Sequence, residues 1–131
     1  MSLIVTNIKW IMLLSGGLTC TMIYAAIAPQ AALQSSFGET MEGPLAEIVV
    51  RNWGVLIALV GAMLIYGAYR PGVRPLVLTV AGLSKLVFIA LVLSHGWRYL
   101  GHQVGAAVVV DAVMVALFAG YLVAARAAAP A

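Results

Sequence analysis

The sequence predicts an all-α integral membrane protein, a bundle of four transmembrane helices formed by a single domain over residues 1–131. Composition is the first reason, because 64% of the 131 residues are hydrophobic and 8% are charged, whereas soluble domains contain about 25% charged residues. Four apolar stretches are the second reason, since each approaches the ~20 residues that a helix needs to cross a bilayer. Little chain remains outside them, and no soluble domain could fold within the longest connection, from Pro29 to Pro44.

The four helices are expected at about residues 8–28, 45–69, 75–94 and 103–126. The first stretch also resembles a secretory signal, because Ala26-Ile27-Ala28 has the small residues of a cleavage site. Its apolar run exceeds the 7–15 residues of a typical signal core, however, and Pro29 directly after the site is unfavourable for cleavage. We therefore predict a transmembrane helix. Pro44 and Pro75 are expected near helix starts, where a missing N–H is harmless.

The distribution of basic residues predicts the orientation. Arg70 and Arg74 lie in the short connection between the second and third helices, and short loops rich in Lys and Arg stay in the cytoplasm. Both termini are then cytoplasmic, and the acidic connection with Glu39 and Glu42 lies outside. Trp53 is expected to mark the membrane boundary on the second helix.

Two ionisable residues, Lys85 and Asp111, lie near the middle of the third and fourth apolar stretches. A charge at this depth is costly and normally faces the protein interior with a partner. Counted from Arg74 and Arg126 at ~1.5 Å per residue, the two side chains lie at overlapping depths. The short connection from Ser94 to His102 makes the two helices antiparallel neighbours. The sequence therefore predicts an ion pair between Lys85 and Asp111.

A second polar group is expected above this pair. Glu47 and Arg51 are spaced i,i+4 in the favourable order, and they share a face with the small residues Gly54 and Gly61, which permit close helix packing. This face should be buried, so both side chains should point inward, although Arg51 can instead extend to the membrane surface. The candidate ligand-binding residues of the polar centre are Tyr24, Glu47, Arg51, Asn52, Ser84, Lys85, Asp111 and, at the rim, His95.

Several classes of function receive no support. Phosphate-binding loops, nucleophile elbows, zinc-protease motifs and Cys pairs are missing from the sequence. His95 and His102 have no acidic or thiol residue at a ligand-like spacing, so we predict no metal, no cofactor and no catalytic residue. The basic residues are scattered singly, which argues against nucleic acid as a partner. Cys20 has no second cysteine to pair with.

Short motifs resemble those of small four-helix bacterial membrane proteins of the DoxX-like group. They are Ala28-Pro29, Ala46-Glu47, Val50-Arg51-Asn52-Trp53-Gly54 and Gly82-Leu83-Ser84-Lys85, with Asp111 in the fourth helix. Family members often have an acid beside the third-helix lysine, where this chain has Ser84, so Asp111 must do more to neutralise Lys85. The resemblance implies a four-helix fold in the bacterial inner (cytoplasmic) membrane.

The function that the sequence favours is a non-enzymatic binding or accessory module, acting on a lipid-like ligand or a membrane partner. The expected partners are membrane lipid and either a second copy of the chain or another membrane protein. The alternative is a small transporter or proton relay in which Lys85 and Asp111 exchange protons or bind a charged solute. A third interpretation is that the buried charges only hold the four helices in register. An enzyme is the least favoured interpretation, because it would have to use Lys85, Asp111 or Glu47 in a way that no known motif indicates.

Overall fold

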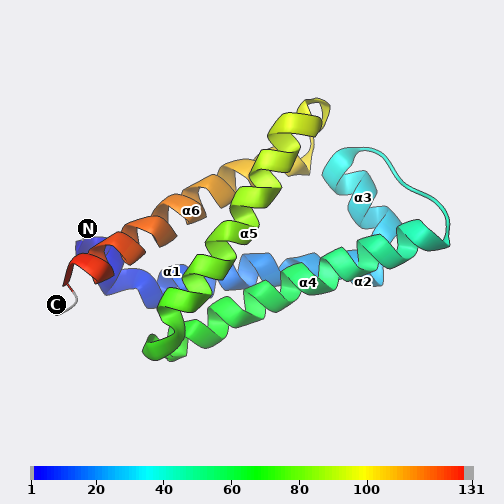
Figure 1. Cartoon of the computed structure of the whole chain (residues 1–131). Coiled ribbons are helices and arrows are strands. Elements are labelled where there is room, and N and C mark those ends of the chain that lie inside the picture. Colours follow the sequence, from blue (N-terminus) through cyan, green and yellow to red (C-terminus); the bar gives the residue numbers. More distant parts are fainter. Residues whose placement is uncertain (1, 129–131) are drawn as a thin grey trace.

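The computed structural model describes residues 2–128, which are almost entirely helical and contain no strand (Figure 1). Four long helices form its frame: α1 (Ser2–Cys20), α4 (Pro44–Tyr69), α5 (Arg74–His95) and α6 (Gln103–Ala128). Five short elements connect them: η1 (Thr21–Ile23), α2 (Tyr24–Ile27), α3 (Pro29–Phe37), η2 (Pro71–Val73) and η3 (Trp97–Tyr99). Four segments within this frame are long and apolar enough to cross a membrane, namely 3–27, 44–69, 71–95 and 103–127.

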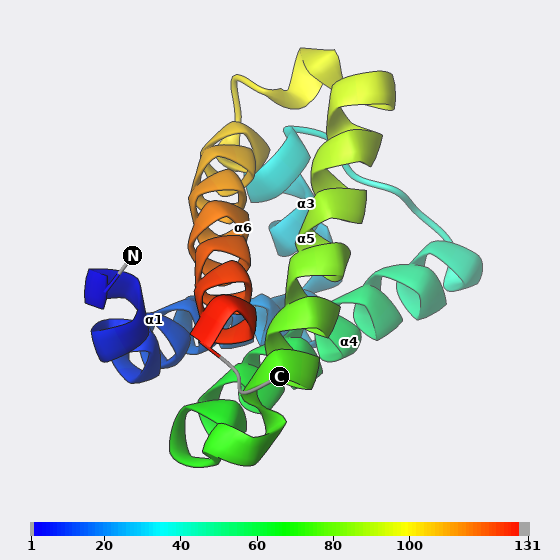
Figure 2. The same ribbon diagram turned by 60° about the vertical axis from the view of Figure 1, so that its left-hand side comes forward.

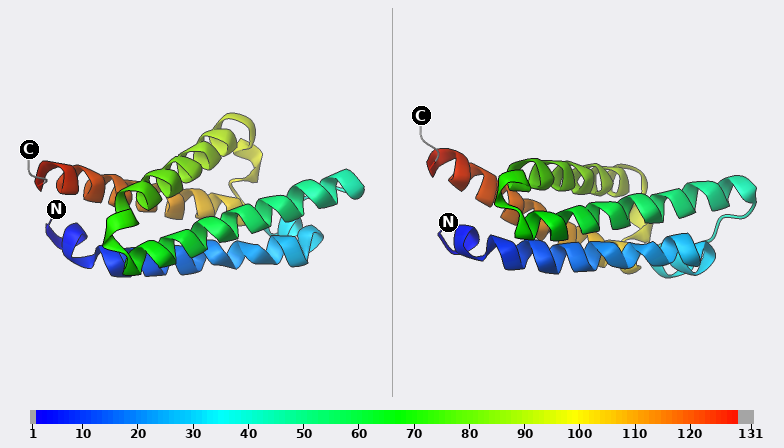
Figure 3. Two further views of the ribbon diagram at one scale, coloured as in Figure 1. Left: turned by 60° about the horizontal axis from the view of Figure 1, so that its bottom comes forward. Right: turned by 90° about the horizontal axis from the view of Figure 1, so that it is seen from below.

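The long helices form two antiparallel pairs. The first pair is α1 and α4, which lie side by side along most of their length (Figure 3). The second pair, α5 and α6, lies across the first, and Figure 2 shows its two helices running in opposite directions next to each other. The third and fourth long helices are thus the antiparallel neighbours that the short connection predicted. Both termini lie at the same end of the molecule as the turn between α4 and α5, called the inner end below.

Proline and glycine set most helix boundaries. Pro29, Pro44 and Pro75 each lie in the first turn of a helix, where a missing N–H leaves no hydrogen bond unmade. Gly38 ends α3 with φ of 73°, a left-handed conformation that glycine adopts without strain. Arg74 covers the end of α4 by donating hydrogen bonds to the carbonyls of Gly67 and Ala68.

Helix α3 is an addition to the predicted four-helix pattern. The chain leaves the helical conformation at Ala28, with φ of −133° and ψ of 71°, because the residue before a proline is disfavoured in the α region. Pro29 then starts a new helix that turns back against α2 and α4. The connection from Pro29 to Pro44 therefore contains a packed helix at the outer end of the molecule, opposite the termini (Figure 1).

Glycines allow α1 and α4 to approach closely. A Cβ added at Gly61 would lie 2.6 Å from the backbone N of Cys20 and 2.7 Å from the backbone O of Gly16. A Cβ at Gly54 would lie 2.7 Å from the backbone N of Ala26, so α4 also lies close to α2. The predicted stripe of small residues on the second helix is confirmed as a surface of close helix contact.

The described residues form two separate apolar cores. The inner core joins all four long helices through Ile8, Met12, Leu64, Ala68, Val77, Leu78, Ala81, Met114 and Phe118. The smaller outer core joins α2, α3 and α4 through Ala25, Ala32, Leu33 and Val50. Helices α5 and α6 contribute no buried residue to this outer core.

Candidate functional site: a cavity above a buried ion pair

The predicted ion pair is present in the structure. Lys85 Nζ on α5 lies 2.9 Å from Asp111 Oδ1 on α6, and their side chains are 8% and 18% exposed. Lys85 also donates a hydrogen bond of 3.3 Å to Thr19 Oγ1 on α1. The ammonium group therefore joins both helix pairs at one point.

Thr19 is a member of this cluster that the sequence reasoning missed. Its hydroxyl donates to the carbonyl of Ser15 at 2.6 Å and accepts from Lys85, so both of its hydrogen-bonding functions are used. Hydroxyl groups on membrane helices commonly donate to the carbonyl four residues earlier, and several in this chain do so. The contact with Lys85 depends on how α1 meets α5, which no local pattern reveals.

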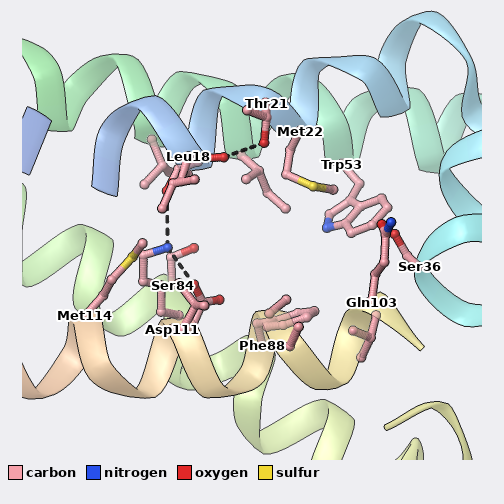
Figure 4. Close-up of a pocket in the computed structure, with 18 of the residues that line it drawn as sticks. Leu18, Thr21, Met22, Ser36, Trp53, Ser84, Phe88, Gln103, Asp111 and Met114 are labelled. Carbon is pink, nitrogen blue, oxygen red and sulfur yellow. Dashed lines mark hydrogen bonds and ion pairs between the residues drawn. The ribbon is translucent and has the colours of Figure 1, made fainter. Parts of the chain in front are cut away.

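A cavity of about 320 Å³ lies on the outer side of the ion pair, between the two helix pairs (Figure 4). Its volume falls at the lower end of the range of roughly 300–1,000 Å³ that is usual for small-molecule sites. Its lining comes from every long helix and from α2 and α3: Leu18, Thr19, Thr21, Met22, Tyr24, Ser36, Trp53, Ile57, Val60, Ser84, Lys85, Phe88, Gln103, Val104, Ala106, Ala107, Val110, Asp111 and Met114.

The cavity is polar at its two ends and apolar between them. Asp111 and Ser84 lie at one end, and Gln103 and Ser36 lie near the indole of Trp53 at the other (Figure 4). Gln103 and Asp111 are eight positions apart along α6, which corresponds to about 12 Å. The middle is formed by side chains such as those of Met22, Ile57, Val60, Phe88 and Val110. Such an arrangement suits an elongated amphiphilic molecule.

The wall of the cavity is open at its sides. Leu18 and Thr21 on the α1 side, and Ala106 and Val110 on the α6 side, line the cavity and are nevertheless exposed. Closer to the inner end the same two helices are sealed by buried Met12, Met114 and Phe118. The opening therefore faces sideways from the helices, toward the surface that carries exposed apolar side chains.

Side chains of α3 and of the connection after it contact the turn that includes η3 near the outer end of the cavity. The ring of Phe37 packs edge-on against Tyr99 at a centroid distance of 5.2 Å and lies 6.2 Å from the ring of Trp53. Glu39 accepts a hydrogen bond from Tyr99 at 3.0 Å and pairs with Arg98 at 3.3 Å. The hydrogen bond with Tyr99 and, next, the charge of Glu39 raise the pKa of Arg98 above its ordinary value.

Of the predicted site residues, Tyr24, Ser84, Lys85 and Asp111 line the cavity. The hydroxyl of Tyr24 is hydrogen-bonded to the hydroxyls of Ser35 and Ser36. Thus the phenol links α2 to α3 at the cavity edge.

The structure does not bring Glu47, Arg51, Asn52 and His95 to the cavity. Glu47 and Arg51 form the expected i,i+4 pair at 2.8 Å, but their side chains are 39% and 48% exposed. Arg51 also donates to the carbonyl of Ala26, two residues before the interruption of the helical conformation at Ala28. The expectation that both point inward is wrong, because Arg51 is used to satisfy a carbonyl at the end of α2. Asn52 and His95 are exposed.

Trp53 is a lining residue that the sequence did not suggest. Its ring faces the cavity and packs near Phe37 (Figure 4). The α3 helix accounts for the difference, since it supplies an interior surface where the sequence suggested only a connection.

Within residues 2–128, no three His, Cys, Asp or Glu side chains come close enough together to hold a metal ion. Comparisons with protein-family models, with curated proteins and with solved structures gave no match. The likeness to the DoxX-like group therefore stays a prediction from the motifs quoted above.

Proposed function

We propose that this chain is a multi-pass protein of the bacterial inner membrane that binds a lipid-like molecule in the cavity between its two helix pairs. The membrane assignment is supported by four helices of suitable length and by the large apolar side chains that they expose. Leu14, Leu76 and Val123, for example, are 69%, 68% and 64% exposed. Apolar surface on this scale is costly in water, and lipid covers it without that cost.

The proposed orientation has both termini in the cytoplasm. Lys9 lies over the ring of Tyr69 at 4.7 Å, and Arg70 and Arg74 occupy the adjacent turn between α4 and α5. With Arg126 at the end of α6, the basic residues of the inner end exceed those of the outer end, where Glu39 and Glu42 lie. Short basic segments favour the cytoplasmic side.

The sideways opening of the cavity is the observation that carries the binding proposal. Leu18, Thr21, Ala106 and Val110 line the cavity yet are exposed, so a molecule dissolved in the bilayer reaches the site without passing through water. At the outer end, Phe37 of α3 packs against Tyr99 of the turn between α5 and α6. A lipid-like ligand fits this access better than a solute from the aqueous phase.

Transport is the alternative, and the inner core argues against it. Between the ion pair and the inner end, the space between the helices is filled by apolar side chains including Met12, Leu64 and Phe118, which are at most 1% exposed. A charged solute or proton crossing this region would lose its hydrogen-bonding partners at high cost. We therefore favour binding over transport, and no catalytic role is proposed.

A substitution that fills the cavity tests the binding proposal. Ala107 lines the cavity, whereas Ala116 lies on an exposed part of the same helix. The full chain is purified in mild detergent as wild type, Ala107→Trp and Ala116→Trp, and the retained lipids are identified by mass spectrometry. We expect one enriched species in the wild type and in Ala116→Trp, and its loss in Ala107→Trp. Identical lipid profiles for all three proteins would refute the proposal and leave the buried ion pair with a structural role alone.

A further inference from the structure

We infer that the cavity selects an uncharged single-chain amphiphile with a hydroxyl-bearing head, such as a monoacylglycerol, over free fatty acids and phospholipids. This inference rests on the proposed function, which places a lipid-like molecule in the cavity. It adds the chemical class of the head group and the place where that head lies, beside the ion pair of Lys85 and Asp111.

The charges that line the cavity favour an uncharged head group. Lys85 and Asp111 carry the only formal charges among the lining residues, and at 2.9 Å they neutralise each other. A carboxylate or phosphate head would compete with Asp111 for the same ammonium group. Two anions would then share one cation at a site whose own side chains are only 8% and 18% exposed, and like charges this close repel each other. A neutral head avoids this cost.

Both members of the ion pair have hydrogen-bonding capacity that no other residue among 2–128 uses. An ammonium group has three donors, and Lys85 directs two of them to Asp111 and Thr19. Asp111 uses Oδ1 for the ion pair, while Oδ2 accepts no hydrogen bond from another residue in the described part of the chain. A donor and an acceptor are thus available side by side. A hydroxyl group satisfies both, because it accepts from one partner and donates to the other.

The size of the cavity and its side opening favour a ligand with a single acyl chain. A volume of about 320 Å³ holds a small head and part of one acyl chain, and the two chains and large head of a phospholipid exceed it. With the head at Asp111, the chain lies along the apolar middle formed by Met22, Ile57 and Phe88. It leaves through the side opening near Thr21 and Ala106, both exposed.

The fluorescence of Trp53 provides a direct test, because this side chain lines the cavity. Trp10 and Trp97 are 64% and 68% exposed, so both can be replaced by Phe to leave Trp53 as the single reporter. The full chain in phosphatidylcholine nanodiscs is titrated with a monoacylglycerol and a fatty acid that carry the same dibrominated acyl chain, which quenches tryptophan on contact. A matched protein that keeps only Trp10 reports contact with bulk lipid.

We expect the monoacylglycerol to quench Trp53 at a concentration about tenfold lower than the fatty acid, a difference of about 1.4 kcal/mol. The fluorescence of Trp10 should be quenched equally by the monoacylglycerol and the fatty acid. Equal or stronger quenching of Trp53 by the fatty acid would overturn this inference and leave the proposed lipid site intact. If neither compound quenched Trp53 more than Trp10, both the inference and the proposed function would fail.

Two variants test whether the ion pair sets the preference. Asp111→Asn leaves the charge of Lys85 without its anion, so the preference should reverse toward the fatty acid by about tenfold. The double variant Lys85→Gln with Asp111→Asn removes both charges and should keep the preference for the monoacylglycerol. The double variant also tests the inference if Asp111→Asn does not fold, since it leaves no charge unpaired. Fatty-acid binding by the double variant that is tighter than in the wild type would contradict the role of charge neutrality.

Discussion

Substitution of Gly61 by alanine tests the contact between α1 and α4 on which the cavity depends. The new Cβ would lie 2.6 Å from the backbone N of Cys20 and 2.7 Å from the backbone O of Gly16. Ordinary contact begins at 3.4 Å, so the gap must widen by 3.4 − 2.6 = 0.8 Å. Both neighbouring atoms belong to the backbone, and no side-chain rotation can relieve the overlap. The helices themselves must separate.

The expected cost follows from this overlap. Overpacking of a close contact typically destabilises a protein by about 1–3 kcal/mol. The gain in helix propensity from Gly to Ala is about 1 kcal/mol and opposes this cost. Gly82→Ala on α5 is the matched control, because nothing lies within 4 Å of its added Cβ. It receives the same gain in propensity and no overlap, so Gly61→Ala should be less stable than Gly82→Ala by about 1–3 kcal/mol.

The measurement is the free energy of unfolding in detergent micelles, from titration with SDS followed by circular dichroism. The wild type, Gly61→Ala and Gly82→Ala are compared under the same conditions. Equal stability of the two alanine variants would refute the close contact of α1 and α4.

Three further predictions concern the ion pair, the aromatic contacts of Phe37 and the orientation of the chain in the membrane. In a double-mutant cycle, Lys85→Met and Asp111→Asn should each destabilise more than their combination, with a coupling energy of about 0.5–3 kcal/mol; additive effects would show that the two side chains are not paired. Phe37→Ala should lower the free energy of unfolding by about 0.5–1.5 kcal/mol for each aromatic contact and speed backbone hydrogen exchange in α3. Unchanged hydrogen exchange would contradict the packing of Phe37 against Trp53 and Tyr99. A cysteine introduced at Gly72, in a background where Cys20 is replaced by Ala, should resist membrane-impermeant thiol reagents in intact cells, whereas labelling from outside would reverse the proposed orientation.

Depth counting predicted the central contact of the fold because it depends on few variables. The rise per residue and the short connection between α5 and α6 are enough to bring Lys85 and Asp111 to one level. The 2.9 Å contact confirms the predicted pair. The small residues of α4 were similarly informative, since Gly54 and Gly61 are buried against the first helix.

The surroundings of that pair were less predictable because they depend on tertiary structure. Arg51 and Trp53 lie close together in the sequence, yet Arg51 is exposed and binds the Ala26 carbonyl while Trp53 faces the cavity. Helix α3 decides both outcomes, because the chain reverses at Ala28 and places Phe37 next to Trp53. A proline marks the reversal in the sequence, but the direction that the following helix takes depends on packing.

Photocrosslinking from inside the cavity tests the central claim most directly. A photoreactive benzoylphenylalanine is introduced at Ile57, which lines the cavity, and separately at Leu59, which is 59% exposed on the same helix. After irradiation of intact membranes, the adducts are identified by mass spectrometry of the purified protein. We predict that Ile57 yields one enriched single-chain amphiphile, whereas Leu59 yields the phospholipid mixture of the surrounding membrane. The same phospholipid mixture at both positions would contradict a selective lipid site in the cavity.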